Sequence, residues 1–336
     1  MSHPNVGSHR VGRRPTTSRR RRRLLRVASV LASCAALLSV SGCGGNSASV
    51  GGIGGSGYVF GPIEELGSIT VAGVTFETDG ATVTIDGELF SPDQLEVGMV
   101  AAVSGVISDD GASGQATVVE VERAVVGEIE SDGGSGGQFD VLGQTVDFTN
   151  STVLRGLAPG DLVRGASVVV DGFVDDDGRV RATRIAAGPA TSDVRLRGPV
   201  SMLDADALTL RVRAVRVRFA NATVLGTLAN DEVVAVRGTV DAGRRVLDAT
   251  LVRVVDTTPR GAADDIASFE GVVVRVVNDS IFRMAGIDRR RTVLTGEETV
   301  FVGGAFADLG PRSRVRVFAR VRGDAVLVAE RVTFLE

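Results

Sequence analysis

Hydrophobic and polar residues alternate along most of the chain in short runs. Two such runs are VRATRI, which begins at Val180, and LDATLV, which begins at Leu247. Alternation at a period of two places the aliphatic side chains on one face of a strand and the polar side chains on the other. Patterns with the period of a helix are scarce, so the sequence predicts an all-β protein.

The alternating runs recur in four related segments. In the second copy FTNSTVL matches FANATVL in the third, and both are followed by a leucine and a valine-rich run. The copies begin at Gly61, Gly127, Gly198 and Gly271, with periods of 66, 71 and 73 residues. These periods exceed those of solenoid repeats, so the copies are expected to be separate domains and not stacked coils. The predicted domains are residues 58–123, 124–188, 189–257 and 258–336.

Each segment contains five predicted strands joined by tight turns. Dipeptides typical of hairpins lie between the runs, at Ala72-Gly73, Asp110-Gly111, Asp177-Gly178 and Ala285-Gly286. Five short strands with one face to bury close most economically into a barrel without exposed edges, and the OB-type barrel has this strand number. Its usual helix is predicted to be reduced to a turn around LRGLAPGD. We therefore expect a tandem array of four small five-stranded OB-like β-barrels, each with its own hydrophobic interior.

Residues 1–42 are predicted to be a lipoprotein signal peptide. Arg19 to Arg23 and Arg26 precede a run of 14 uncharged residues, which has the order of a signal peptide and is too short for a membrane span. The sequence Val40-Ser41-Gly42-Cys43 resembles the bacterial lipobox, in which the cysteine is acylated. Residues 43–57 would then be the lipidated Cys43 and a Gly/Ser-rich tether. The arginines also resemble a twin-arginine export signal, and the general secretory route is the alternative.

Charge is distributed unevenly along the chain. All 37 basic residues are arginine, and nine of them lie in the predicted leader. The mature chain would then contain 28 arginines and 41 acidic residues, which gives it a net charge of −13. This balance argues against nucleic acid as a partner. The four segments carry 12 acids and one arginine, 10 and 5, 8 and 10, and 11 and 12. We expect the acidic first segment to be repelled from anionic headgroups, while the arginine-bearing outer segments meet a partner.

The tether GGIGGSG and the following GSITVAGVTFET and LEVGMVAAVSG resemble the family called domain of unknown function 5666, found in tandem in bacterial envelope lipoproteins. The resemblance covers nearly all of residues 51–336 and is weakest in the fourth copy. There Ala319 replaces the strand-end glycine present as Gly105, Gly172 and Gly238. The family implies an OB-like fold and an envelope location, and it supplies no site residues.

The composition after the leader removes most catalytic chemistry. From Cys43 onward the sequence has no His, Lys or Trp, and no cysteine besides Cys43 itself. Ser-His-Asp and Cys-His arrangements therefore lack their base, Schiff-base chemistry lacks its amine, and zinc sites lack their nitrogen and sulfur ligands. We expect no enzyme and no cofactor; a carboxylate-dependent hydrolase is the catalytic alternative that remains.

The acidic run DGFVDDDG is a candidate metal site. It offers four carboxylates within seven residues, although its spacing is not that of an EF-hand loop. An Asp-Gly hairpin turn with solvated acids is the favoured interpretation of the run. The candidate calcium ligands are Asp171, Asp175, Asp176 and Asp177.

The run LRVRAVRVRF is a candidate binding stripe. Its arginines alternate with apolar residues on two strands joined near Ala214, so they are expected to share one face. The second and third strands form the customary ligand face of OB-type barrels, and guanidinium groups suit phosphate, carboxylate or glycan ligands. A solvated outer face is the alternative. The candidate binding residues are Arg211, Arg213, Arg216 and Arg218.

These observations predict a non-catalytic, lipid-anchored protein of the cell envelope whose tandem domains serve as a binding or scaffolding array. Gly44, in place of the aspartate that retains lipoproteins at an inner membrane, favours the outer membrane facing the periplasm. The expected partners are the membrane, through the lipid, and an anionic glycan, lipid or protein. A small-ligand or cation-binding module that uses the Asp-rich turns is the alternative from a different functional class.

Overall fold

The computed structural model describes residues 55–131, 137–175, 177–189, 192–241, 246–255, 264–286, 290–322 and 326–335. The predicted signal peptide and Cys43, the predicted site of acylation, lie outside the described residues. The predicted tether ends too late, because its last three residues, Gly55 to Gly57, already belong to the first strand. The described elements are strands and three-residue 3-10 helices, which confirms the all-β class, and none of the described helices is long and apolar enough to cross a membrane.

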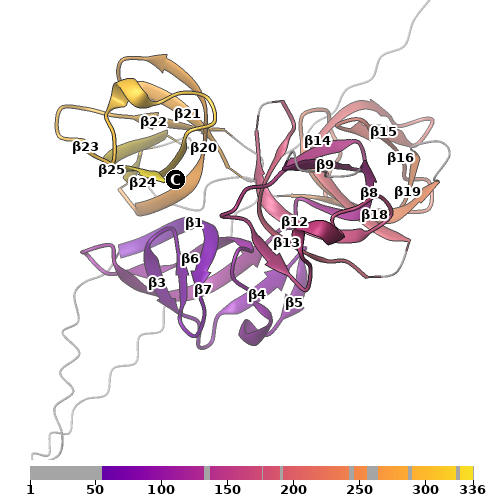
Figure 1. The fold of residues 1–336 in the computed structure, drawn as a ribbon, viewed down its shortest axis with the longest axis horizontal. Helices are drawn as coiled ribbons and strands as arrows, with labels where there is room; N and C mark the ends of the chain where they lie inside the picture. The colour runs from indigo at the N-terminus through magenta and orange to yellow at the C-terminus, as the bar shows by residue number, and fades with distance from the viewer. Residues whose placement is uncertain are drawn as a thin grey trace, which may run out of the picture. The chain divides into compact units, whose positions relative to one another are not determined.

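The first segment forms a closed barrel of five strands (Figure 1). The circuit runs β1–β2–β3–β7–β6 and returns to β1; every pairing is antiparallel except that between β3 and β7. This is the strand order of an OB-type barrel. The elements are β1 (Gly55–Glu65), β2 (Ile69–Val71), β3 (Val74–Glu77), β4 (Thr82–Ile85), β5 (Glu88–Phe90), η1 (Pro92–Gln94), β6 (Val100–Ile107) and β7 (Ser113–Val121).

The same circuit recurs in each of the three later segments, within their described residues. In the second segment the strands are β8 (Val125–Ser131), β9 (Gln138–Val141), β10 (Gln144–Asp147), β11 (Val153–Arg155), β12 (Ser167–Val174) and β13 (Val180–Ala187). In the third they are β14 (Asp193–Asp204), β15 (Thr209–Val212), β16 (Val215–Arg218), β17 (Thr223–Leu225), β18 (Val233–Asp241) and β19 (Val246–Val254). In the fourth they are β20 (Ile266–Asn278), β21 (Ile281–Ala285), β22 (Arg290–Leu294), β23 (Val300–Val302), β24 (Arg314–Arg322) and β25 (Val326–Leu335).

The turn predicted around LRGLAPGD is a 3-10 helix, η3 (Pro159–Asp161). It stands between β11 and β12, where an OB fold usually has an α-helix. The fourth segment has its counterpart, η4 (Phe306–Asp308), at the same place. The short strands β11 and β23, which precede these two 3-10 helices, pair in parallel with the last strands of their barrels, as β4 does in the first segment. The prediction of a reduced helix is therefore confirmed.

The strand-end glycines of the first three segments lie at a bulge in the next-to-last strand of each segment, namely β6, β12 and β18. The register between the last two strands shifts at Gly105, Gly172 and Gly238. A Cβ atom at any of these positions would overlap a carbonyl oxygen of the neighbouring strand, so glycine permits the close approach. Ala319 occupies the corresponding bulge in the fourth segment, so the bulge is present there without glycine.

The barrels are not separate, because the first strand of each leaves one edge open. Residues 55–62 of β1 pair with β6 on one side, and β2 begins to pair on the other side at Ile63. The free edge from Gly57 to Phe60 pairs in parallel with β20. In the same way β8 pairs with β14, antiparallel, at Val125 and Val126. In the described part of the chain the strands thus join into a 13-stranded and a 12-stranded sheet.

The expectation of four separate interiors is wrong. Among the described residues the buried hydrophobic side chains form three clusters. The largest cluster is continuous across the second and third segments, from Phe139 to Leu247. The cluster of the fourth segment also contains Phe60 and Phe173 from the first two. Closure into a barrel was expected to remove every edge, but the open half of each first strand brings the apolar faces of neighbouring segments into contact.

Candidate functional site

The structure separates Arg213 from the other three arginines of the predicted stripe. Arg211 and Arg216 lie directly opposite each other on β15 and β16, and both side chains are exposed. Arg218 is also exposed on β16, where its guanidinium binds the Asp248 carboxylate through Nε at 2.5 Å and Nη2 at 2.6 Å. Arg213 lies in the turn with a positive φ of 53° and donates from Nε to the Arg197 carbonyl at 3.1 Å. The shared face therefore holds three of the four arginines.

The predicted calcium ligands are not brought together. Asp171 is fully buried in β12 and receives a hydrogen bond from Arg184 Nη1 at 2.8 Å. Asp175 accepts bonds from the backbone of Asp177 and Arg179, as the hairpin-turn alternative expects. Asp176 lies outside the described residues. No group of three or more His, Cys, Asp or Glu side chains that could hold a metal ion occurs in the described part.

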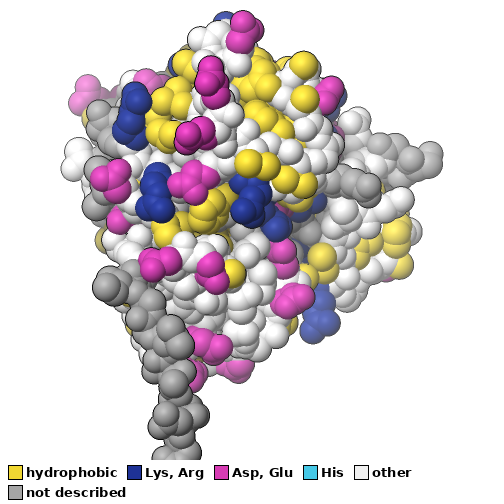
Figure 2. Space-filling model, turned by 90° about the vertical axis from the view of Figure 1, so that its left-hand side faces the viewer, with side chains coloured by type: hydrophobic (Ala, Val, Ile, Leu, Met, Phe, Trp, Pro, Cys, Tyr) yellow, Lys and Arg dark blue, Asp and Glu magenta, His cyan; other side chains and the backbone are white. Residues whose placement is uncertain are grey.

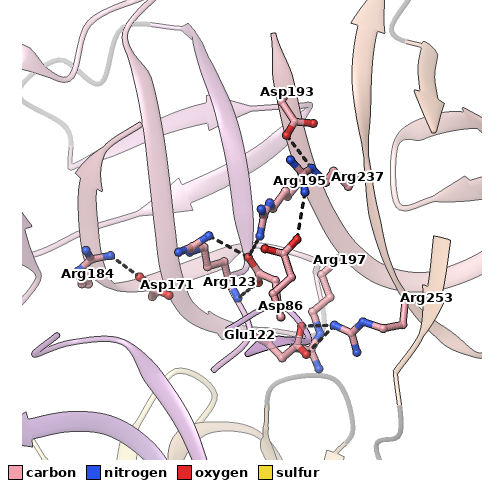
Figure 3. A network of polar contacts seen from close by, with 11 residues as sticks. Asp86, Glu122, Arg123, Asp171, Arg184, Asp193, Arg195, Arg197, Arg237 and Arg253 are labelled. Carbon is pink, nitrogen blue, oxygen red and sulfur yellow. Dashed lines mark hydrogen bonds and ion pairs between the residues drawn. The ribbon is translucent and has the colours of Figure 1, made fainter. Parts of the chain in front are cut away.

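The most developed polar cluster lies where the first segment meets the second and third (Figure 3). Its first centre is Asp86, in the turn between β4 and β5, with a positive φ of 52°. The Asp86 carboxylate accepts bonds from the Arg123 backbone at 3.0 Å and from Arg123 Nη1 at 3.0 Å. Arg195 of β14 forms an ion pair with the same carboxylate. Asp86 thus connects the end of the first barrel to the first strand of the third.

The second centre of this cluster is Glu122, immediately after β7. Its carboxylate binds Arg253 Nη2 at 2.7 Å and lies 3.5 Å from Arg197 Nη1. Burial lowers the pKa of the Arg197 guanidinium to about 10, and the negative charge of Glu122 opposes this change. Both arginines belong to the third segment, so the carboxylate of the first segment compensates charges that the third barrel could not bury alone.

The third centre connects the first and second segments. Arg184 on β13 donates to Asp171 and, from Nη2 at 2.5 Å, to Glu96 of the first segment. Burial raises the pKa of Asp171 to about 6, against the attraction of Arg184. Beside it the Thr183 hydroxyl donates to the Gly98 carbonyl at 2.7 Å. The Arg184 guanidinium and the buried Thr183 hydroxyl therefore both bind the second segment to the first.

Two further ion pairs extend the pattern. Arg237 of the third segment binds Asp193 at 2.7 Å and Glu88 at 3.1 Å. Arg316 of the fourth segment binds Glu64 at 2.7 Å. Among the described residues, five acids of the first segment pair with arginines from the other three. These acids are Glu64, Asp86, Glu88, Glu96 and Glu122.

The sequence contained the signal for this cluster in its uneven charge. The arginines that form these ion pairs belong to the second, third and fourth segments, and they pair with the acidic first segment of the same chain. An external partner of the arginine-bearing segments stays a prediction. On the face drawn in Figure 2, basic and acidic side chains are interspersed with hydrophobic ones. The carboxylates and guanidinium groups of this cluster bind each other. The role that this arrangement supports is to hold the segments together and fix their relative orientation.

A model of the family described as Domain of unknown function (DUF5666) matches residues 59–120, 126–186 and 270–333, which together make up more than half of the chain. The chain belongs to this family. The three DUF5666 matches fall on the first, second and fourth segments, and the third segment shares their strand order in the structure. The first-segment acids at Glu64, Asp86 and Glu96 lie within the first DUF5666 match.

A solved chain described as "drosophila Unr CSD456" is similar at 17% identity, over 64% of this chain and 97% of that chain, with a TM-score of 0.16. No curated protein matches the sequence.

Proposed function

We propose that this DUF5666 chain is a non-catalytic, lipid-anchored protein of the cell envelope whose OB-like barrels form one preassembled binding and scaffolding body. The observation that carries the proposal is the joining of the segments by strand pairing and ion pairs. Barrels fixed relative to one another present their outer faces at set spacings, which lowers the entropic cost of engaging an extended partner. Barrels joined by flexible linkers would not offer this advantage.

The anchor rests on the lipobox-like Val40-Ser41-Gly42-Cys43, and Gly44 favours the outer membrane facing the periplasm. The test is incorporation of labelled palmitate by the full chain in a bacterial host. We expect Cys43→Ser to abolish labelling and Cys34→Ser to leave it unchanged, because Cys34 lies in the uncharged run of the leader. Labelling of Cys43→Ser at the wild-type level would contradict the anchor.

The outward face of β15 and β16 is the part of the body best suited to an anionic envelope partner. Arg211 and Arg216 are cross-strand neighbours, and neither guanidinium makes a hydrogen bond or ion pair with another described residue. Like charges directly opposite each other destabilise a strand pair, and an anionic group placed between them would offset that repulsion. These are the second and third strands of the barrel, the customary ligand face of the OB fold.

Binding of the full chain to arrays of anionic glycans and lipopolysaccharide tests this face. The double variant Arg211→Ser and Arg216→Ser should lose at least tenfold in affinity. The matched control changes Arg275 and Arg283, which also lie opposite each other but on β20 and β21, to serine. We expect this control to bind as the wild type does. Equal binding by all three proteins would reject the face as a binding surface.

A further inference from the structure

One strand edge of the fourth segment carries exposed hydrophobic side chains. The strand β23 pairs with β25 on one side, and no described strand pairs with its other side. Val300 and Val302 are 55% and 44% exposed, whereas Phe301 between them packs against the hydrophobic core of the segment. An exposed apolar edge is a template for further strand pairing, and native proteins usually protect or cover such an edge.

The equivalent strands of the other three segments have further contacts. In the first segment β4 is covered by β5, which pairs with it antiparallel. In the second, β11 ends at Arg155, whose Nε lies 3.6 Å from a carboxylate oxygen of Glu96 in the first segment. In the third, β17 ends at Leu225 beside Arg253, which binds Glu122 of the first segment. For β23 no hydrogen bond or ion pair reaches another segment within the described part of the chain.

The chain covers its other open edges with barrels of the same kind. The free part of β1 pairs with β20, and the free part of β8 pairs with β14. In both cases the edge of one OB-like segment accepts the edge of another segment with the same strand order. A second copy of this chain supplies the same type of edge, so the architecture itself indicates what covers β23.

The sequence of β23 suits antiparallel pairing with itself. A register centred on Phe301 would place Val300 of each copy opposite Val302 of the other, as two-fold symmetry requires. Cross-strand pairs of β-branched side chains stabilise a sheet. The same register sets Glu298 opposite Gly304, so like charges do not oppose each other along the edge.

The charge on the next strand is also compatible with this pairing. On β25, Arg331 lies beside Val300 and Thr333 lies beside Val302. In the paired sheet the two Arg331 side chains would stand at opposite ends of the valine patch, three strand spacings or about 14 Å apart. This separation exceeds the Debye length of about 8 Å at physiological ionic strength, so their repulsion is largely screened.

We propose that β23 is a homodimer contact, in which its open edge pairs antiparallel with β23 of a second copy of the chain around Phe301. The contact goes beyond the proposed lipid anchor and arginine face and requires neither of them. It joins two binding bodies through their fourth segments.

Sedimentation of the full chain in detergent tests the contact over a concentration series. We expect a reversible dimer, and Val300→Glu should weaken dimerisation at least tenfold because it places a carboxylate opposite a valine. The matched control is Val277→Glu on β20 of the same segment, where the valine is 43% exposed, and it should dimerise as the wild type does. A wild-type chain that stays monomeric at about 100 μM, or a dimer that Val300→Glu leaves unchanged, would overturn the proposal.

A charge pair tests the register. Val302→Arg should also weaken dimerisation, but a mixture of the Val300→Glu and Val302→Arg chains should associate more tightly than either variant alone, because the register sets the two new charges opposite each other. Equal melting temperatures of these variants and the wild type confirm that they fold. A mixture that associates no better than its components would overturn the register and with it the contact.

The measurement is repeated with Cys43→Ser to separate this contact from the anchor. We expect the same dimerisation whether or not Cys43 is acylated. A dimer that disappears with Cys43→Ser would depend on the lipid and would overturn the pairing of β23.

Discussion

The second and third segments are joined by a hydrophobic junction, whereas the first segment is joined to the third through charged side chains. In the first junction, Leu196 lies opposite Val125 in a core that is continuous across both barrels. In the second, Asp86 and Glu122 bind arginines of the third segment. Both junctions involve β14, the third segment's first strand, which pairs with β8 of the second segment and contributes Arg195 to the ion pair with Asp86 of the first segment.

This difference has thermodynamic consequences. A hydrophobic junction depends on buried area and responds little to salt or pH. A charged junction depends on each carboxylate having its arginine, so it responds to single charge changes and to titration. The comparison therefore predicts which substitutions separate the segments and under which conditions.

Leu196→Ala should have the largest effect. Its side chain is 1% exposed, and truncation would leave a cavity where the two barrels share their core. We expect the free energy of unfolding, measured by chemical denaturation, to fall by about 4 kcal/mol. The control Leu89→Ala removes the same atoms from a side chain that is 78% exposed, and it should change stability by less than about 0.5 kcal/mol. Similar losses in both variants would contradict a shared core.

The strands and their closure were predictable from sequence because period-two alternation and turn dipeptides act within each segment. The pairing between segments was not, since the same alternation occurs in every copy and does not specify which open edge meets which. The contact between β1 and β20 joins residues that are about 200 positions apart. Only the charge asymmetry of the first segment indicated that the copies complement each other.

Two site residues were misplaced by applying regular geometry where the chain is irregular. Asp171 was grouped with the Asp-rich turn, but the register shift between Asp171 and Gly172 belongs to a bulge inside β12, where the carboxylate faces Arg184. Arg213 is two residues after Arg211, so regular alternation predicts that both side chains lie on the same face. Arg213 instead lies in the turn after β15.

Asp171 gives the second largest effect, through pH. Burial raises its pKa to about 6, from an ordinary value near 3.9. Between these values the folded state holds a proton that the unfolded state has released, so the free energy of unfolding falls as the pH rises through this window. Asp171→Asn removes this titration. The stability of the wild type relative to the variant should fall by about 3 kcal/mol between pH 3 and pH 7. A difference that is constant with pH would contradict the shifted pKa.

Glu122→Gln should have a smaller but still clear effect. It removes the carboxylate that Arg253 and Arg197 share, and the side chain of Glu122 is 11% exposed. Loss of one partner from a largely buried ion pair leaves the opposite charge uncompensated. We expect a decrease of about 2 kcal/mol in the free energy of unfolding, because partial solvation of Arg253 moderates the cost. An unchanged denaturation midpoint would show that the charged junction does not stabilise the body.

Glu88→Gln should have the smallest effect. It makes the same substitution as Glu122→Gln, but at the solvent-exposed rim of the charged junction, so the two variants compare an exposed with a buried carboxylate. The side chains of Glu88 and Arg237 are 51% and 40% exposed, and Arg237 keeps Asp193 as a partner. Exposed pairs contribute less than about 1 kcal/mol, and 1 M salt should reduce even this difference, since the Debye length is then about 3 Å. Denaturation of both glutamate variants at low and high salt measures the contrast. If Glu88→Gln costs as much as Glu122→Gln, desolvation of the carboxylate is not what makes the charged junction sensitive.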